Sequence, residues 1–252
     1  QKLEPTDISF QIGPRINASG RLADASLAVE LFLENDYKQC LSLAEELEAL
    51  NKTRQRIERS MIREAEEMSE SLPPHKLGHV LYHPDWHPGI VGVVAGKLSR
   101  EWNIPCFVLG REGEIAKGSG RSSSGVNLVK IHQDCSSYLE TWGGHPMAAV
   151  VSLPVDHVPA FQKAFHEALD REMQSGEPLE QELPISLWLQ PDELNSIIFE
   201  ALEHLRPFGQ KNPRPVFAMQ NLVLRDRPQA VGKNHLRFRI PGTGMHPEVA
   251  YQ

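Results

Sequence analysis

The residues best suited to chemistry lie in glycine-rich motifs, and the first of these is GPRINASGRL at residues 13–22. It holds Arg15, Asn17 and Arg21 in what we predict to be a loop. The N–H groups of an arginine guanidinium match the spacing of phosphate oxygens, and glycines let the backbone come close to an anion. The motif therefore indicates an anion site, although a structural loop with a capping asparagine would have the same spacing.

A second motif, KGSGRSSSG at residues 117–125, is predicted to lie between a strand and a helix. Ser119 and Ser122 offer hydroxyl donors, and Arg121 supplies positive charge. The start of the following helix adds free N–H groups and the positive end of its dipole. This pattern favours a phosphate-binding turn in which Arg121 is exposed. An ordinary Ser/Gly-rich connection is the alternative.

A third motif, WGGHPMAA at residues 142–149, is predicted to be a turn between a helix and a strand. Gly143 and Gly144 leave room for a ligand, and the imidazole of His145 can donate to a phosphate or to a base edge. A satisfied surface histidine is the alternative interpretation.

The segment HPDWHPG at residues 83–89 contains two histidines and one aspartate, which are potential metal ligands. Its prolines and the absence of cysteine partners argue against a zinc site. We predict instead a turn from a strand into a helix, on the ligand side of a sheet. No residue of this chain is predicted to bind a metal.

Helices and strands must position these motifs. The most clearly predicted of them is a helix from Tyr37 to Leu72. Apolar residues recur at helical spacings with no Gly or Pro before Pro73, and Arg54 interrupts the series. Such a helix is about 50 Å long. We expect it to join two domains, because the sequence character differs on its two sides. Packing on one domain, or a short coiled-coil seam, are alternatives.

The region after this helix alternates between strands and helices. Strands are predicted at residues 78–83, 105–110, 114–120 and 147–154, and helices at residues 89–102, 126–142 and 158–173. This order predicts an α/β domain in which helices cover a sheet.

The last region, from about residue 183, reads as a small β-barrel. We predict a strand at 185–190, a helix at 191–205, and a hairpin-like pair at 215–226 and 235–240 around a turn at 231–234. The chain stops inside a further predicted strand at 247–252. Because an incomplete barrel leaves open edges, we expect the native sequence to continue.

The 252 residues carry a net charge of −7, which taken alone disfavours nucleic acid. The charge is unevenly distributed, however. Residues 206–240 contain eight basic residues and one acidic residue. Their net charge is therefore +7, and that of the rest of the chain is −14. Such a change of sign along a chain indicates a binding face, and scattered solvated charges are the alternative.

Three features of the sequence indicate the cellular compartment of the protein. The cysteines Cys40, Cys106 and Cys135 show no metal-ligand or disulfide spacing, which indicates reduced thiols. The sequence has no apolar run of about 18 residues and no signal-peptide pattern. We therefore predict a cytoplasmic, monomeric protein with no membrane partner.

Together and in this order, the motifs resemble those of one family. GPRINASGRL, WHPGIVGVVAG, GSGRS, GGHPMAA and LRPFGQKNPRPVF are similar to the later motifs of the RecJ exonucleases, in the DHH phosphoesterase superfamily. The resemblance covers residues 10–245. Gly120 stands where alanine is common in the family, and we expect either residue to be small enough. The GGH piece alone is shared with other DHH-type phosphodiesterases and with relatives of alanyl-tRNA synthetase.

The resemblance implies an α/β fold in four parts: the tail of a DHH domain at 1–36, a long connecting helix at 37–74, a DHH-associated, substrate-binding α/β domain at 75–176, and a partial OB-like barrel that binds DNA at 183–252. It implies that Arg15, Asn17 and Arg21 lie near the metals. The residues implied to hold DNA phosphates from the opposite wall are Ser119, Arg121, Ser122, Gly143, Gly144 and His145. Candidate DNA-binding residues of the barrel are Arg225, Arg227, Lys233, Arg237 and Arg239.

The implied activity of the intact protein is 5′→3′ hydrolysis of single-stranded DNA in repair and recombination, with Mn²⁺ or Mg²⁺ as cofactor. The sequence contains no Asp-His-His triplet, so we expect the metal-binding half to lie outside this chain and the chain alone to be inactive. Two alternatives remain open. One is a DHH-type phosphodiesterase acting on cyclic dinucleotides or short oligonucleotides, and the other is a non-catalytic nucleic-acid-binding module.

Overall fold

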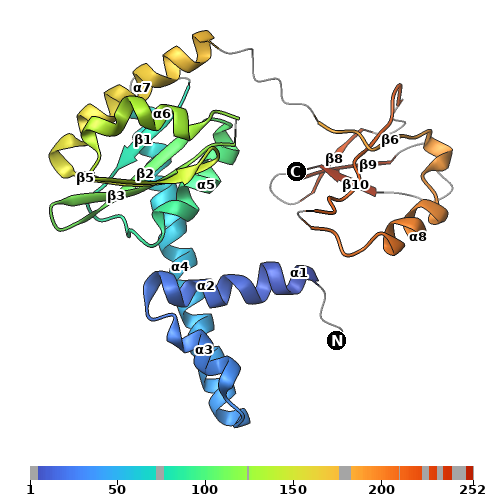
Figure 1. Cartoon of the computed structure of the whole chain (residues 1–252). Helices are drawn as coiled ribbons and strands as arrows, with labels where there is room; N and C mark the ends of the chain where they lie inside the picture. Colours follow the sequence, from blue (N-terminus) through green and yellow to red (C-terminus); the bar gives the residue numbers. More distant parts are fainter. Residues whose placement is uncertain are drawn as a thin grey trace. The chain divides into compact units, whose positions relative to one another are not determined.

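The chain folds into two compact units, residues 1–181 and 182–252 (Figure 1). The computed structural model describes residues 5–71, 77–123, 125–175, 183–209, 211–222, 227–231, 235–239 and 248–251. In this part of the chain, no helix has the length and apolar character needed to cross a membrane.

The N-terminal motif is helical, so the predicted loop at residues 13–22 is wrong. A short helix α1 (Pro5–Asp7) and a π-helical turn (Ile8–Ile12) lead into α2 (Gly13–Leu22), and α3 (Ser26–Leu33) follows. Proline is favoured in the first turn of a helix, where its missing N–H is not needed. Ala18 and Ser19 are buried, and α2 packs on the next helix, α4. This packing outweighs the weak helix propensity of the two glycines.

The predicted long helix is confirmed as α4 (Tyr37–Ser71). Its N-terminal half packs against α2 and α3, whereas Met61, Ile62 and Ala65 in its C-terminal half belong to the core beneath the sheet. Arg54 does not interrupt the packing. Its guanidinium donates to Oδ1 of the buried Asn51 and pairs with Glu58 at 2.6 Å, so the charge is satisfied within the helix itself.

A five-stranded mixed sheet follows, which confirms the predicted α/β fold class. Its strands are β1 (His79–Tyr82), β2 (Cys106–Glu112), β3 (Ile115–Arg121), β4 (Thr141–His145) and β5 (Ala148–Pro154). They lie in the order β1-β2-β3-β5-β4, where β1 and β2 are parallel and the other neighbours antiparallel. The strand β4 is therefore at one edge of this sheet.

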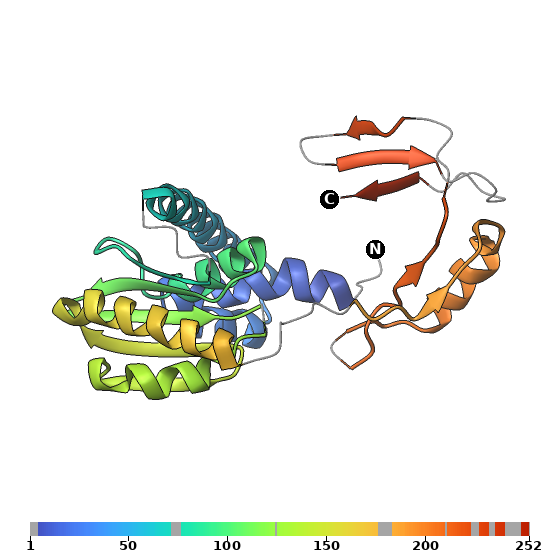
Figure 2. The same cartoon turned by 90° about the horizontal axis from the view of Figure 1, so that it is seen from above.

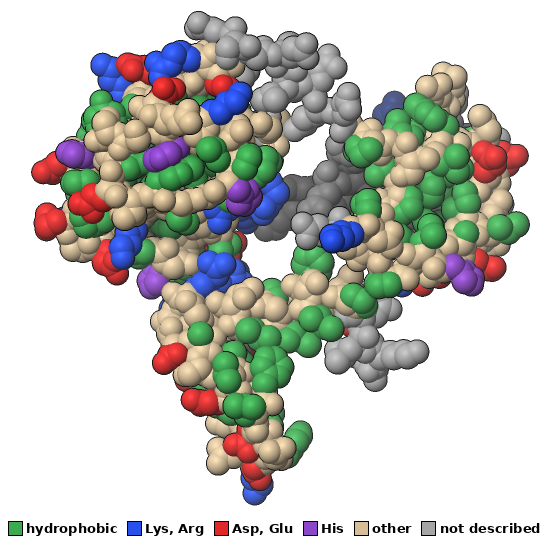
Figure 3. Space-filling model, viewed as in Figure 1, with side chains coloured by type: hydrophobic (Ala, Val, Ile, Leu, Met, Phe, Trp, Pro, Cys, Tyr) green, Lys and Arg blue, Asp and Glu red, His purple; other side chains and the backbone are tan. Residues whose placement is uncertain are grey.

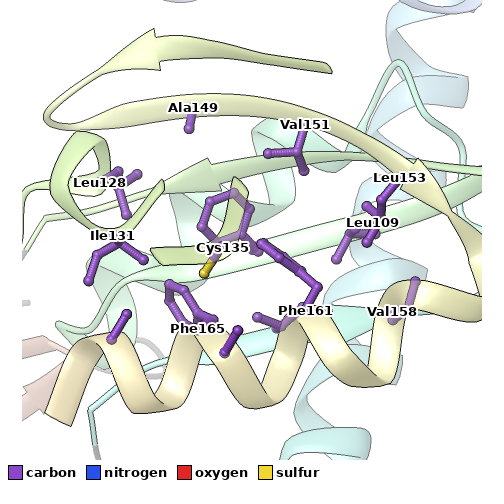
Figure 4. Close-up of a cluster of buried hydrophobic side chains, with 14 of the residues drawn as sticks. Leu109, Leu128, Ile131, Cys135, Ala149, Val151, Leu153, Val158, Phe161 and Phe165 are labelled. Carbon is purple, nitrogen blue, oxygen red and sulfur yellow. The ribbon is translucent and has the colours of Figure 1, made fainter. Parts of the chain in front are cut away.

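Helices cover both faces of the sheet (Figure 2). On one face α6 (Leu128–Cys135) and α7 (Val158–Ser175) enclose the larger apolar core, and on the other α5 (Val91–Trp102) packs with α4. Figure 4 shows how Phe161 and Phe165 from α7 meet the sheet in the larger core. Their rings lie edge-on to that of Phe107 at 5.4 and 5.3 Å between centroids, a favourable aromatic geometry.

This aromatic packing corrects the expectation for Gly120. A Cβ at that position would lie 2.4 Å from the Phe107 ring, which is itself held by the two phenylalanines of α7. Alanine is therefore not equivalent to glycine in this chain.

The predicted helix at 126–142 is too long. The helix α6 ends at Cys135, a short 3-10 turn (Ser136–Tyr138) follows, and the chain then enters β4. The strand forms because it pairs with β5 along its whole length, and because the Trp142 ring stacks on His132 of α6 at 4.1 Å between centroids. Both contacts are tertiary, so local periodicity does not reveal them.

The second unit contains short strands, one α-helix and a short 3-10 helix (Pro191–Glu193) among its described residues. They are β6 (Leu187–Trp188), α8 (Ser196–His204), β7 (Phe217–Ala218), β8 (Gln229–Val231), β9 (His235–Arg239) and β10 (Glu248–Tyr251). The strands β6 and β7 are parallel, whereas β8, β9 and β10 form an antiparallel sheet that does not close. The expected final strand is thus confirmed. The second strand of the expected hairpin is confirmed as β9, but its hairpin partner is β8 at 229–231 and not the predicted strand at 215–226, whose described part β7 pairs with β6.

Candidate phosphate-binding cleft

A cleft of about 590 Å³ lies on the part of the sheet that α5 leaves uncovered. The helix α5 packs on β2 and β3, whereas Val150 in the centre of β5 remains 58% exposed. The described residues that line the cleft include three cations but no aspartate or glutamate; the polar and charged ones are Arg21, Lys117, Ser119, Arg121, Thr141 and Ser152. The cleft is therefore suited to an anion.

The strand β3 supplies one wall through alternate residues. Lys117, Ser119 and Arg121 are two positions apart and share the face that meets α5, because successive side chains of a strand point to opposite faces. The second motif thus presents these side chains from β3, which confirms the strand predicted at residues 114–120 and extends it to Arg121.

The guanidinium of Arg121 is held in place by β3 itself. Its Nη1 donates to the Ser119 hydroxyl at 2.5 Å and to the Gly120 carbonyl at 2.7 Å. Ser119 is buried and its hydroxyl donates in turn to the Ala149 carbonyl at 3.1 Å. The side chain of Arg121 is half-buried, which corrects the expectation of an exposed residue. Burial lowers the pKa of Arg121, and the nearby positive charge of Arg21 lowers this pKa further.

Arg21 reaches the cleft from the end of α2. Its Nη1 donates to the carbonyl of Gly89 at 2.9 Å, in the turn between β1 and α5 that the sequence predicted. A Cβ at Gly89 would lie 2.3 Å from the carbonyl oxygen of Arg21, so only glycine permits this close approach. Two arginines that are 100 positions apart in the sequence are brought together in this way.

The helix α5 closes the cleft with its small-residue face. A Cβ at Gly92 would lie 3.2 Å from the Ser119 hydroxyl and 3.3 Å from Nη2 of Arg121, which is tighter than ordinary packing. The glycine therefore lets the helix lie against the two polar side chains without displacing them.

In the third motif, Gly143, Gly144 and His145 lie in the edge strand β4, and the predicted turn is limited to Pro146 and Met147, which join β4 to β5. His145 is exposed, and its Nδ1 accepts a hydrogen bond from the Met147 N–H at 3.3 Å, which leaves Nε2 to donate outward. A Cβ at Gly144 would lie 2.4 Å from the Ala148 carbonyl oxygen, whereas one at Gly143 would make ordinary contact with Val150 at 3.6 Å. Gly144 is required by the fold, but Gly143 is not.

Two residues of the first motif lie away from this cleft. Arg15 pairs with Glu48 of α4 at 2.6 Å and donates to the Gln11 carbonyl at 2.6 Å, so it holds α2 against α4. The hydrogen bond from Arg15 lowers the pKa of Glu48. Asn17 is exposed and lines a second pocket of about 540 Å³ between α2 and α3, which shares Arg21 with the cleft. Only Arg21 of this motif meets the second motif.

The serines that follow Arg121 have mainly structural positions. Ser122 is buried, and its hydroxyl has no hydrogen-bond partner among the residues that the structure describes. The Ser123 hydroxyl donates to the Ser99 carbonyl at 2.5 Å, which ties this connection to α5. The structure thus brings Ser119 and Arg121 to the cleft, but places Ser122 below the surface.

The basic candidates of the second unit are only partly described. Arg227 is exposed, and the backbone of β9 carries Arg237 and Arg239 at alternate positions. Arg225 and Lys233 lie outside the described residues. Two other basic residues of the unit have intramolecular contacts: Arg206 pairs with Glu203 at 2.9 Å, and Arg214 lies over the ring of Phe208.

Sequence reasoning missed several residues of the cleft. Thr141 and Ser152 face it from β4 and β5, with 2.6 Å between their hydroxyl oxygens. Gly92 was predicted only as part of the helix at residues 89–102, with no role in a site. The alternation of β5 is the signal that could have found Ser152, whereas Thr141 lay inside a predicted helix.

Residues 76–171 match the DHHA1 domain, and residues 185–250 match the RecJ OB domain. The two matches together cover more than half of the chain, and the second is a domain of one family. The chain belongs to the RecJ family. The cleft described above is therefore that of a RecJ-family DHHA1 domain together with Arg21 from the segment that precedes it.

Curated relatives named single-stranded-DNA-specific exonuclease RecJ agree with this assignment. The Bacillus subtilis RecJ is 36% identical over 92% of this chain and 30% of its own length, and the Escherichia coli RecJ is 35% identical over 98% of this chain and 44% of its own length. This RecJ-family chain thus spans less than half the length of these relatives.

Solved structures of the family have the same fold. RecJ from Thermus thermophilus in complex with Mn²⁺ is 29% identical, covers 94% of this chain and 35% of its own, and gives a TM-score of 0.82. The same RecJ in complex with Mg²⁺ gives a TM-score of 0.81 over 94% of this chain and 36% of its own. The RecJ of Thermus thermophilus thus binds divalent metals in both structures. In the described part of this chain, however, no group of three or more His, Cys, Asp or Glu residues is arranged to hold a metal.

Proposed function

We propose that this chain holds single-stranded DNA for an exonuclease that hydrolyses it from the 5′ end in repair and recombination. The observation that carries the proposal is the meeting of Arg21 and Arg121 in a cleft whose described lining contains no acid. Two nearby guanidinium groups repel each other, and a phosphate between them relieves that repulsion. The curated relatives, named for action on single-stranded DNA, support the choice of this anion.

Within this proposal each cleft residue has a distinct role. Arg121 and Arg21 neutralise one phosphate from two sides, and Ser119 orients Arg121 as a positioning residue. Nε2 of His145 is available to donate to the same strand of DNA or to its 5′ end. Since Arg15 is engaged with Glu48, we assign it to the fold, and we leave Asn17 as a candidate contact beside α3.

The metals of the intact enzyme are proposed to be Mn²⁺ or Mg²⁺, bound by residues outside this chain. Relatives crystallised with these ions support the choice of metals. The described residues do not offer a fitting set of ligands, so no chemical step is assigned to this part of the protein. Its contribution is to bind and orient the substrate.

We also propose that residues 1–36 are the end of a DHH domain whose remainder packs on α1, α2 and α3. Large apolar side chains are exposed along these helices, as Figure 3 shows in green. They include Val29, Phe32 and Leu33 of α3, and Phe10 in the π-helical turn between α1 and α2 is 78% exposed. An apolar surface of this kind is normally buried against another part of a protein.

The second unit is proposed to bind single-stranded DNA through its basic residues. The RecJ OB match and the net charge of +7 between Arg206 and Ile240 support this role. OB-folds bind single strands through a positive groove with aromatic surfaces. Arg227, Arg237 and Arg239 are the candidates within the described residues, and Arg225 and Lys233 remain sequence-based candidates.

The proposal is tested by incubating the chain with labelled 5′-phosphorylated single-stranded DNA and Mn²⁺. We expect binding without degradation, and much weaker binding of duplex DNA or cyclic dinucleotides. Degradation by a sample free of contaminating nuclease would show that the chain holds its own metal site. Preferential binding of cyclic dinucleotides would instead favour the phosphodiesterase alternative.

A further inference from the structure

The far end of the cleft carries a row of polar side chains that the proposed function does not yet use. Lys117 on β3 lies directly across from Ser152 on β5, which lies directly across from Thr141 on β4. All three line the same cleft as Arg21 and Arg121. The row is thus a continuous polar strip across three strands, and its one charged member is a cation.

The spacing along β3 between Ser119, beside which the charge of Arg121 lies, and Lys117 suits consecutive phosphates. Arg121 folds back so that its Nη1 lies 2.5 Å from the Ser119 hydroxyl, which places its charge beside Ser119. Ser119 and Lys117 are two residues apart on β3, a separation of about 7 Å along a strand. This is comparable to the step between neighbouring phosphates of an extended single strand.

The two hydroxyl groups of the row, on Thr141 and Ser152, retain one hydrogen that can be donated to a ligand. Thr141 Oγ1 and Ser152 Oγ lie 2.6 Å apart, so one hydroxyl hydrogen is used between them. The hydrogen of the accepting hydroxyl remains available for an oxygen in the cleft. Thr141 is exposed, and the exposed Val150 beside the pair offers an apolar surface to the sugar that links two phosphates.

Lys117 also keeps donors for an anion although it has an ion pair. Its ammonium group contacts the Glu112 carboxylate, and both side chains are more than half exposed, at 51% and 60%. An ammonium group has three N–H donors, so a contact with one carboxylate leaves others free. An exposed ion pair of this kind is weak and can be shared with a phosphate.

We propose that Lys117, Thr141 and Ser152 form a second phosphate subsite, which holds the phosphodiester next to the phosphate at Arg121. The inference rests on the proposed function, because it assumes that the first phosphate lies between Arg21 and Arg121. The cleft then binds two consecutive phosphates of one strand, and the smallest ligand that occupies both subsites is a dinucleotide.

The test compares two probes on the full chain in the presence of a chelator: thymidine 5′-monophosphate and 5′-phosphorylated dithymidylate. Dissociation constants are measured by displacement of a labelled oligothymidylate. The wild type should bind the dinucleotide about five-fold more tightly, on the scale of one exposed charged contact. Lys117→Gln should remove most of this preference without changing the affinity for the mononucleotide.

Further variants separate the parts of the subsite. Thr141→Val together with Ser152→Ala should also reduce the preference, whereas Glu112→Gln should increase it by releasing Lys117. Lys163→Gln is the matched control, because Lys163 also pairs with a glutamate, Glu167, but lies on α7. On a longer oligothymidylate, Lys117→Gln should reduce the salt slope by about 0.7, the value of one phosphate contact.

The two proposals fail in different ways. If Arg121→Ala weakens both probes but Lys117→Gln changes neither the preference nor the salt slope, the second subsite is wrong and the proposed function stands. If the wild type shows no dinucleotide preference, the subsite is equally overturned. If Arg121→Ala changes neither probe nor the longer oligothymidylate, the proposed function itself is overturned.

Discussion

At the scale of single residues, the cleft depends on positive charges that the fold forces together. Arg121 is half-buried, and burial together with the neighbouring Arg21 makes its charged form less favourable. Within the described part of the chain, its guanidinium donates to neutral oxygens, those of Ser119 and Gly120. The charge is therefore hydrogen-bonded but not neutralised, which is the arrangement that favours an incoming phosphate.

The first prediction concerns Arg121→Ala. We expect binding of 5′-phosphorylated single-stranded DNA to weaken roughly ten- to hundredfold, the value of a lost hydrogen bond to a charged group. The free energy of unfolding should change little, because the variant also removes the repulsion from Arg21. Fluorescence titration and urea unfolding measure the two quantities.

Arg171→Ala is the control for Arg121→Ala, since Arg171 pairs with Asp134 between α7 and α6. It should leave DNA binding unchanged. If both variants bind DNA equally well, Arg121 has no role in the cleft. If Arg121→Ala unfolds the protein, the residue is structural.

The second prediction concerns Glu64 on α4, which anchors the turn that follows β1. Its carboxylate accepts from the Ser60 hydroxyl at 2.7 Å and from Nε1 of the buried Trp86 at 2.8 Å. The hydrogen bond from Ser60, and then that from Trp86, lower the pKa of Glu64. The ionised Glu64 carboxylate therefore stabilises the fold fully at pH values above the ordinary glutamate pKa. This stabilisation is lost as the pH falls through the lowered pKa of Glu64 in the folded protein.

Glu64→Gln should therefore be less stable than the wild type at neutral pH, with a difference that shrinks as the pH falls below about 4. Urea unfolding followed by tryptophan fluorescence across the acid range measures this difference. Glu67→Gln, at an exposed position on the same helix, is the control. A pH-independent difference would show that the ionised carboxylate is not the cause.

At the scale of elements, the sequence predicts those whose pattern is local. The helix α4 and most strands of the first sheet follow from periodicity alone. The helix α2 does not, because its glycines argue against a helix and its packing on α4 is tertiary. The strand β4 was missed for the same reason, since its two glycines suggest a turn until β5 provides the pairing.

The residues of the cleft were, like the helices and strands, predictable only where a local sequence pattern marks them. Ser119 and Arg121 stand out because a motif of hydroxyls, glycines and one arginine is visible in the sequence. The placement of Arg21 beside Arg121 depends on the close approach of the Gly89 turn to α2, which no local pattern reveals. Thr141 and Ser152 are ordinary strand residues, and only the register of β5 places them in the cleft.

The third prediction separates the two glycines of β4. Gly144→Ala should cost roughly 1–3 kcal/mol of folding free energy, because its Cβ would collide with the Ala148 carbonyl oxygen. Gly143→Ala has room for its Cβ and should fold normally. Urea unfolding of the two variants side by side provides the measurement, and equal stability would contradict the assignment of Gly144 to the fold.

At the scale of the whole molecule, positive charge is concentrated in one stretch of the second unit. Residues 206–240 have a net charge of +7, whereas residues 1–181 contain 18 basic and 26 acidic residues, a net charge of −8, so the cleft is a local positive site in an acidic unit. We expect short-range contacts in the cleft and the basic stretch each to contribute to the affinity for single-stranded DNA.

The last prediction is that the second unit provides much of the affinity for long single strands. Each phosphate neutralised contributes about −0.7 to the slope of log affinity against log salt. Residues 1–181 alone should therefore bind a long oligothymidylate more weakly than the full chain, and with a shallower slope. Reversing the charge of Arg237 and Arg239, which are alternate positions on β9, should give the same trend within the full chain. Reversal of Arg171 is the control for a general charge effect. Equal affinity and equal slope with and without the second unit would show that its positive charge does not serve DNA binding.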